Sequence, residues 1–181
     1  MGQALAAAGR LPEARTLLES AAEAEPGPSE SLNELGVVLV RLGRIDEARA
    51  AFTRLLDADP TATSTWYNLG LLELGARRGA EAAAAFTHVV ELDPQHADGW
   101  RGLAAAVAPG DRTRAISAWQ RVIAIEPRDF DTLYNLGMLL AESGNRAAVP
   151  YLQRFVAEAP PDRYARDLPQ VRAALARMER P

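Results

Sequence analysis

Residues 66–94, WYNLGLLELGARRGAEAAAAFTHVVELDP, decide the fold. Trp66, Leu69 and Gly70 stand in the first half of this stretch, and Ala82 and Phe86 stand in the second half. Apolar residues fall three and four positions apart in both halves, which predicts two amphipathic helices joined by a short turn. Each large apolar side chain contributes only about 1.5–3 kcal/mol when it is buried, so one such hairpin has too little core to fold alone. The stretch therefore predicts a unit that stacks on copies of itself.

The same unit recurs along the chain. Prolines close successive helical runs at intervals of 34, 34, 33 and 33 residues, namely Pro26, Pro60, Pro94, Pro127 and Pro160. Twelve positions before each proline stands an alanine, and eight positions before each stands a large apolar residue, namely Leu18, Phe52, Phe86, Trp119 and Leu152. Proline lacks an N–H and has a fixed backbone angle, so each one ends a helix and begins the turn into the next.

These residue types at these offsets resemble the tetratricopeptide repeat, a helix–turn–helix module of about 34 residues. The resemblance implies an all-α fold, a right-handed solenoid of antiparallel helix pairs. We expect the array over residues 1–160, with a partial repeat at 1–28 and full repeats at 29–62, 63–96, 97–129 and 130–160. The expected helix pairs are 29–42 with 45–58, 62–75 with 79–92, 96–107 with 111–125, and 129–142 with 145–158. Gly75 and Gly79 bracket the turn of the 63–96 repeat, and we expect a shorter first helix there.

The two ends of the chain differ from the middle. Residues 161–181 are expected to form a C-terminal capping helix, because five apolar residues step by four, three, four and three along them, namely Tyr164, Leu168, Val171, Leu175 and Met178. Pro150 falls in the second helix of the last repeat, where a proline is tolerated only in the first turn or at a kink. The first repeat lacks about half of its first helix, so we expect a fragment of a longer protein or a truncated gene product.

Composition excludes several classes of function. The net charge of −4, from 20 Lys+Arg and 24 Asp+Glu, disfavours nucleic acid as a partner. The chain has no cysteine, and neither of its two histidines, His88 and His96, has metal-ligand spacing, so no metal and no cofactor is expected. Because nucleophile and phosphate-loop motifs are absent, the prediction is that the protein is not an enzyme. No apolar run is long enough to span a membrane. The expectation is a soluble protein without a membrane partner, with the cytoplasm favoured over the periplasm and the compartment left open.

The resemblance also implies where a ligand binds, because family members carry it on the inner face of the first helices. Carried over by position, the predicted binding residues are Asn33, Val37, Ser64, Tyr67, Asn68, Leu71, Arg101, Asp131, Tyr134, Asn135 and Met138. The pattern is an apolar floor with amides and tyrosines beside it, which suits a peptide segment. Asn68 and Asn135 either bond a peptide backbone or bond locally, and the sequence leaves both interpretations open. Four carboxylates against Arg101 on this face disfavour an acidic ligand terminus and favour a neutral to basic segment.

Three hypotheses of function follow. The favoured one is a non-enzymatic protein–protein interaction scaffold that binds a peptide or a partner-protein segment in this concave groove. The second is an accessory tail of a larger enzyme, because such arrays resemble those appended to sulfatase-like and glycosyltransferase proteins. The third is a module that self-associates through the edge left by the truncated first repeat.

Overall fold

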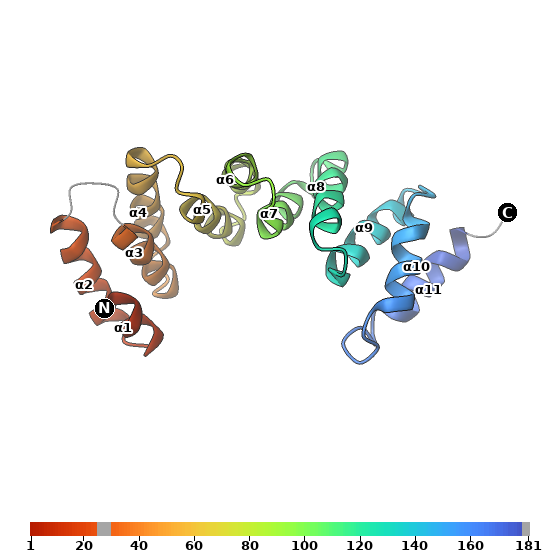
Figure 1. Cartoon of the computed structure of the whole chain (residues 1–181), viewed down its shortest axis with the longest axis horizontal. Coiled ribbons are helices and arrows are strands. Elements are labelled where there is room, and N and C mark those ends of the chain that lie inside the picture. Colours follow the sequence, from red (N-terminus) through yellow and green to blue (C-terminus); the bar gives the residue numbers. More distant parts are fainter. Residues whose placement is uncertain (25–29, 179–181) are drawn as a thin grey trace. The chain divides into compact units, whose positions relative to one another are not determined.

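The computed structural model describes residues 1–24 and 30–178, and these form eleven α-helices and no strand (Figure 1). Those helices are α1 (Gly2–Ala7), α2 (Leu11–Ala24), α3 (Glu30–Arg41), α4 (Ile45–Ala58), α5 (Thr63–Gly75), α6 (Gly79–Leu92), α7 (Ala97–Val107), α8 (Arg112–Ile125), α9 (Phe130–Glu142), α10 (Ala148–Glu158) and α11 (Leu168–Met178). The all-α prediction is confirmed. Pro26, the predicted repeat boundary after residue 28 and the last three residues of the predicted cap lie outside the described residues.

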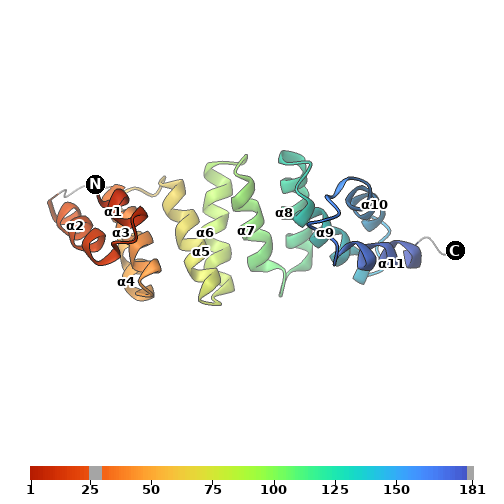
Figure 2. The same cartoon turned by 90° about the horizontal axis from the view of Figure 1, so that it is seen from below.

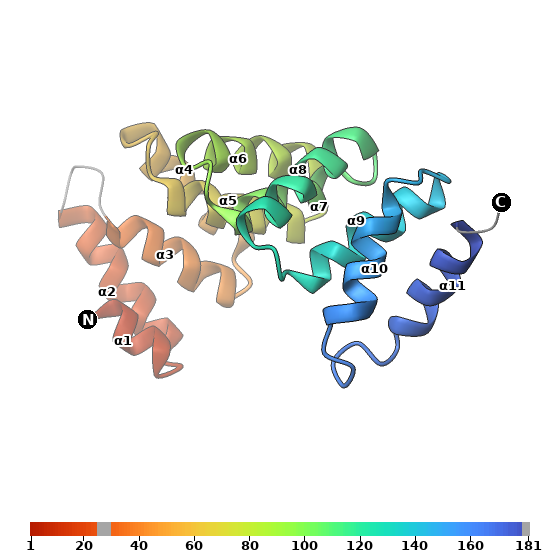
Figure 3. The same cartoon turned by 45° about the vertical axis from the view of Figure 1, so that its right-hand side comes forward.

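The helices pack as antiparallel hairpins within two compact units, residues 1–102 and 103–181. In the first unit α1 packs on α2, α3 on α4, and α5 on α6, and the first helices α1, α3 and α5 also contact one another in sequence. Figure 2 shows α5 and α6 side by side as one such hairpin. In the second unit α9 packs on α8 and α10, while α11 packs on both α9 and α10 (Figure 3). The bounds of the eight helices predicted in pairs agree with α3 to α10 within three residues, and the contacts of α3 with α4, α5 with α6 and α9 with α10 agree with three of the predicted pairs. The repeat boundaries stay a prediction.

Glycines on the first helices bring the helices of a hairpin close together. A Cβ atom on Gly70 of α5 would lie 2.8 Å from the ring of Phe86 on α6, and a Cβ on Gly36 of α3 would lie 2.3 Å from the ring of Phe52 on α4. Both phenylalanine side chains are completely buried. The periodic small and large residues of the sequence therefore face each other across each hairpin, as helices at short interaxial distance require.

The tryptophans of the repeat pattern are only half-buried. The indole N–H groups of two of them bond to backbone carbonyls, as partly buried indoles usually do. Trp66 Nε1 donates to the carbonyl oxygen of Pro60 at 2.8 Å, and Trp100 Nε1 donates to that of Pro94 at 3.0 Å. Trp66 and Trp100 thus each join their helix to the proline turn six residues earlier.

The prediction of a shorter first helix in the 63–96 repeat is wrong. Helix α5 has 13 residues, against 12 for α3. Gly75 is its last helical residue, and Arg77 takes the left-handed conformation, φ 60°, that ends the helix. Gly43 and Gly144 hold the equivalent position after α3 and α9, with φ of 74° and 68°. An arginine therefore does what glycine does in the other turns, and the two flanking glycines do not shorten the helix.

The last hairpin and the cap follow the predicted pattern, but α10 and α11 both begin later than predicted. Helix α10 begins at Ala148 rather than 145, because the preceding residues form a turn in which Asn145 Oδ1 accepts from the Ala147 N–H at 3.0 Å. Pro150 consequently stands in the first turn of α10, where it disrupts no helical hydrogen bond. Helix α11 itself starts at Leu168, and residues 161–167 form a turn. The apolar stripe of the cap is buried from Tyr164 to Leu175.

Candidate functional site

A cavity of about 450 Å³ opens between α3 and α5 at the end where both helices meet their turns. Val37 and Val40 of α3, Ile45 at the start of α4 and Leu71 of α5 form its apolar wall. All four side chains are more than a third exposed, and Leu71 reaches 45%. The buried ring of Phe52 also lines the cavity. Neighbouring apolar side chains left in solvent around a concavity are typical of a binding surface.

A second cavity of about 310 Å³ lies between α1 and α3. Gln3, Asn33 and Glu34 supply its polar groups, and Val37 and Arg41 belong to both cavities. The two cavities therefore adjoin across α3, and we call them together the α3 groove. It lies entirely within residues 1–102.

Two asparagines join the first helices along this groove. Asn68 Nδ2 donates to Asn33 Oδ1 at 2.9 Å, and Thr65 Oγ1 donates to the same oxygen at 3.3 Å. One amide can make several hydrogen bonds, so Asn68 Oδ1 and Asn33 Nδ2 still have capacity for a ligand. Asn68 therefore bonds locally through Nδ2 while its Oδ1 can still accept from a peptide backbone. Both interpretations that the sequence left open, local bonding and peptide binding, are compatible with this arrangement.

The charged side chains of the groove are partly engaged. Arg41 Nη1 donates to the carbonyl oxygen of Ala6 at 2.9 Å, which satisfies a carbonyl at the end of α1. Glu34 accepts a hydrogen bond from Gln3. Sequence reasoning missed Arg41 and Ile45 as groove residues, because the positions carried over from the family stop before the turn. The available signal was an isoleucine at the first position of the expected second helix.

Three other predicted residues of the first unit lie outside the two cavities. The ring of Tyr67 packs edge-on against Phe86, with ring centroids 5.9 Å apart, and beside His96 at 5.3 Å. Burial raises the pKa of the Tyr67 hydroxyl above its usual value. Arg101 pairs with Asp98 on the same helix at 2.5 Å, and Ser64 is exposed.

The predicted residues of the second unit lie against the C-terminal segment. Asp131 pairs with Arg163 at 2.7 Å and accepts a hydrogen bond from the hydroxyl of Tyr164 at 2.9 Å. The hydroxyl of Tyr134 donates to Gln170 Oε1 at 3.3 Å. Met138 packs against the core of this unit, whereas Asn135 is exposed. Asp131 and Tyr134 thus hold the cap in place, a role that the sequence analysis did not assign to them.

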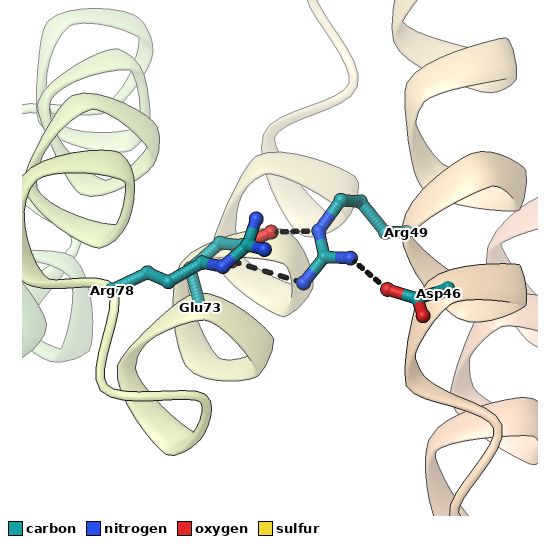
Figure 4. A network of polar contacts seen from close by, with 4 residues as sticks. All are labelled: Asp46, Arg49, Glu73 and Arg78. Carbon is teal, nitrogen blue, oxygen red and sulfur yellow. Dashed lines mark hydrogen bonds and ion pairs between the residues drawn. The ribbon is translucent and has the colours of Figure 1, made fainter.

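A buried ion pair joins α4 to α5 (Figure 4). Glu73 is only 3% exposed, at a position where the resemblance leads one to expect tyrosine. Arg49 Nε donates to Glu73 Oε1 at 2.5 Å and Nη2 donates to Oε2 at 3.2 Å, while Nη1 contacts Asp46. The bond to Glu73 raises the pKa of the Arg49 guanidinium. Both oxygens of the buried Glu73 carboxylate accept from Arg49, so we interpret this pair as structural.

Both histidines have structural partners. His96 Nδ1 accepts a hydrogen bond from the Gly99 N–H at 3.0 Å, which makes it a cap for α7. The ring of His88 stacks on Trp66 at 4.2 Å. Within residues 1–24 and 30–178 no three His, Asp or Glu side chains gather closely enough to hold a metal ion. Among the same residues, no helix has the length and apolar character needed to cross a membrane.

A family model described as tetratricopeptide repeat matches residues 1–63, 67–108 and 105–163. The chain belongs to the tetratricopeptide repeat family. Membership supports a role as a scaffold for protein–protein interaction and confirms the resemblance seen in the sequence. No curated protein matches the chain.

Solved structures of tetratricopeptide repeat proteins share the fold. A crystal structure of MamA is 22% identical, with a TM-score of 0.79, over 87% of this chain and 93% of that chain. MamA from Desulfovibrio magneticus RS-1 is 21% identical, with a TM-score of 0.76, over 86% of this chain and 89% of that chain. YrrB, described as a tetratricopeptide repeat protein with an unusual peptide-binding site, is 21% identical with a TM-score of 0.75, over 99% of this chain and 89% of that chain. At these identities the likeness concerns the fold.

Proposed function

We propose that the chain is a non-enzymatic interaction scaffold that binds a peptide segment of a partner protein in the α3 groove. The observation that carries the proposal is the ring of exposed apolar side chains, Val37, Val40 and Leu71, around a cavity of about 450 Å³. A cavity of this size accepts one large apolar side chain. YrrB, which has a similar fold, is described as having a peptide-binding site, and this adds support.

The polar groups beside the cavity suit a peptide backbone. Asn68 Oδ1 can accept from a peptide N–H, and Asn33 Nδ2 can donate to a peptide carbonyl. Both atoms lie on the amide pair that already joins α3 to α5, so the pair is held in place before a ligand arrives. A preformed pair reduces the ordering cost of binding.

The charges favour a basic residue next to the apolar anchor. Asp98 and Asp131 are neutralised by Arg101 and Arg163, so they attract a ligand less than their formal charges suggest. Glu34 lines the smaller cavity and accepts a hydrogen bond from the uncharged Gln3, and Glu30 stands one helical turn earlier on α3. The guanidinium of Arg41, which also lines the groove, is held against the carbonyl oxygen of Ala6. A segment with an apolar side chain followed by arginine or lysine therefore matches the groove.

The expected affinity is modest. Burying one large apolar side chain contributes about 1.5–3 kcal/mol, and hydrogen bonds at an exposed surface add about 1 kcal/mol each. After the entropy of association, the sum is typical of transient recognition in the micromolar range or weaker.

The test selects peptides from a displayed random library on the wild-type protein and measures their affinity for variants by fluorescence anisotropy. A Val37→Ser/Leu71→Ser double variant should weaken binding at least about tenfold, because the anchor loses its apolar contacts. Leu92→Ser is the matched control, since Leu92 is a similarly exposed leucine, 41%, that lines neither cavity. Selected peptides that bind a correctly folded double variant as tightly as the wild type would overturn the groove assignment.

A further inference from the structure

The second unit has a cavity at the position equivalent to the larger part of the α3 groove. It measures about 380 Å³ and lies between the turn after α9 and the end of α11. Ala141 and Arg146 line it, and they follow Gly137 by four and nine residues, as Val40 and Ile45 follow Gly36. A cavity beside the turn that follows a first helix therefore occurs in both units, after α3 in the first and after α9 in the second, with different side chains around it.

The lining of this cavity is basic. Arg146 comes from the turn before α10, and Arg177 comes from the last turn of α11. Glu142, the acidic lining residue, is already approached by Arg112, whose Nη2 lies 3.3 Å from Glu142 Oε2. Within the described parts of the chain, Arg146 and Arg177 make no ion pair with any carboxylate. Two uncompensated guanidinium groups thus border one cavity in a chain whose net charge is −4.

We propose that this cavity binds a carboxylate side chain from an acidic segment of a partner protein. The planar guanidinium group donates two parallel hydrogen bonds to a carboxylate, and two such groups from different elements can hold it from two sides. Ala141 and Ala174 are small, which leaves room for an aspartate or glutamate between the arginines. The half-buried Met178 adds an apolar contact for the methylene groups of the entering side chain.

This site is independent of the peptide site proposed above. The α3 groove lies within residues 1–102 and is lined by apolar side chains with Glu34 and Arg41, whereas the second cavity lies within residues 141–178 and is lined by Arg146, Arg177 and Glu142. The larger part of the α3 groove is mainly apolar and the second cavity is mainly charged, so the two sites are expected to take different side chains. A change in one site should leave binding at the other unaltered, so the two proposals can fail separately.

The experiment measures the affinity of a fluorescein-labelled peptide of alternating glutamate and alanine for the whole chain. The same peptide with glutamine in place of glutamate is the ligand control. Arg146→Gln and Arg177→Gln should each weaken binding of the glutamate peptide about tenfold, because each removes charge-assisted hydrogen bonds. Arg172→Gln, an exposed arginine of α11 that does not line the cavity, should leave the affinity unchanged. Both lining arginines are on the surface, and circular dichroism confirms that the variants stay folded.

Two further arms complete the test. Raising the salt concentration from about 0.05 to about 0.5 M should weaken binding strongly, since the site is open to solvent. Arg146→Glu should abolish binding of the glutamate peptide while the Val37→Ser/Leu71→Ser variant retains it. Equal affinity for the glutamine peptide, or unchanged affinity in both lining-arginine variants, overturns the proposal. Displacement of the peptide by inorganic phosphate at a lower concentration than by free glutamate peptide would identify a phosphate site and also overturn it.

Discussion

Glu73 is 3% exposed and receives two hydrogen bonds from Arg49, which belongs to the preceding helix hairpin. The repeats expected at 29–62 and 130–160 hold buried leucines at the same position, Leu39 and Leu140. A carboxylate here must be compensated, because a charge taken out of water without a partner is costly. Arg78, whose Nε lies 3.8 Å from Glu73 Oε2, provides only weak additional compensation. The stack of α4 on α5 therefore depends on Arg49.

Arg49→Met is expected to destabilise the protein by about 2–4 kcal/mol, since it leaves Glu73 buried with one distant partner. Urea unfolding followed by circular dichroism measures the loss. The double variant Arg49→Met/Glu73→Leu should recover most or all of it, because a buried ion pair and an apolar pair of similar volume are often equally stable. If the double variant is as unstable as the single one, the loss comes from packing of the arginine stem rather than from the orphaned carboxylate.

The helix pairs could be predicted because they depend on local signals. The proline interval and the glycine opposite Phe52 or Phe86 recur at fixed distances, and each signal acts within one hairpin. The misprediction at α5 came from expecting the two glycines around its turn to shorten the helix, whereas α5 runs through Gly75 and Arg77 takes the left-handed conformation that follows its end. Glycine usually marks a left-handed position in a sequence. Because an arginine takes this conformation here, the residue type gave no indication of it.

The candidate site was less accessible to sequence reasoning. Val37, Asn68 and Leu71, which were predicted from family positions, line a cavity, and their part in ligand binding stays a prediction. Asp131 and Tyr134 stand at family positions too, but their polar atoms bond to the C-terminal segment. Asp131 contacts Arg163 and Tyr164, and Tyr134 contacts Gln170. Those contacts join residues more than thirty positions apart through a non-repeating segment, and a repeat pattern contains no information about them.

Gly70→Ala tests the close approach of α5 and α6. The added Cβ would lie 2.8–2.9 Å from three atoms of the Phe86 ring. Gly102 of α7 packs against the same ring from another helix. Because the ring cannot move aside, the variant should lose about 1–3 kcal/mol of stability in thermal unfolding. Gly75→Ala on the same helix is the control, as a Cβ there meets nothing within 4 Å. It should be neutral or slightly stabilising, and a loss in the control equal to that of Gly70→Ala would contradict the steric explanation.

Arg77→Gly should stabilise the protein. The left-handed conformation costs a residue with a Cβ about 1–2 kcal/mol, and glycine removes that cost while it loses more backbone freedom on folding. The net gain is expected to be about 1 kcal/mol, visible as a higher midpoint of thermal unfolding. The turn bonds from the N–H groups of Arg77 and Arg78 to the carbonyls of Leu74 and Glu73 do not use the arginine side chain, so they persist.

Gly43→Ala provides the reverse experiment in the equivalent turn after α3. Gly43 has a φ of 74° with open space around it. An alanine there meets no steric clash, but its Cβ makes the left-handed backbone conformation energetically unfavourable. It should destabilise by about 1 kcal/mol. Equal midpoints for wild type, Arg77→Gly and Gly43→Ala would show that backbone conformation does not limit stability in these turns.

Tyr164 makes the cap sensitive to alkaline pH. Its side chain is 5% exposed, and burial, reinforced by the hydrogen bond to Asp131, raises the pKa of its hydroxyl from 10.0 to about 12. The folded state therefore favours the protonated hydroxyl. This contribution to stability is fully present below pH 10 and is lost as pH rises to about 12, a loss of about 2–3 kcal/mol in the free energy of unfolding.

Tyr164→Phe should remove that part of the pH dependence. Phenylalanine keeps the ring contacts with Phe155 and Phe130 but has no group to ionise. Urea unfolding of wild type and variant at pH about 8 and about 11.5 gives the comparison, with the stability of the variant falling less between the two. Tyr151→Phe, a half-buried tyrosine of α10, retains Tyr164 and should fall as the wild type does. Equal alkaline losses in wild type and Tyr164→Phe would mean that the cap is released by ionisation elsewhere in the chain.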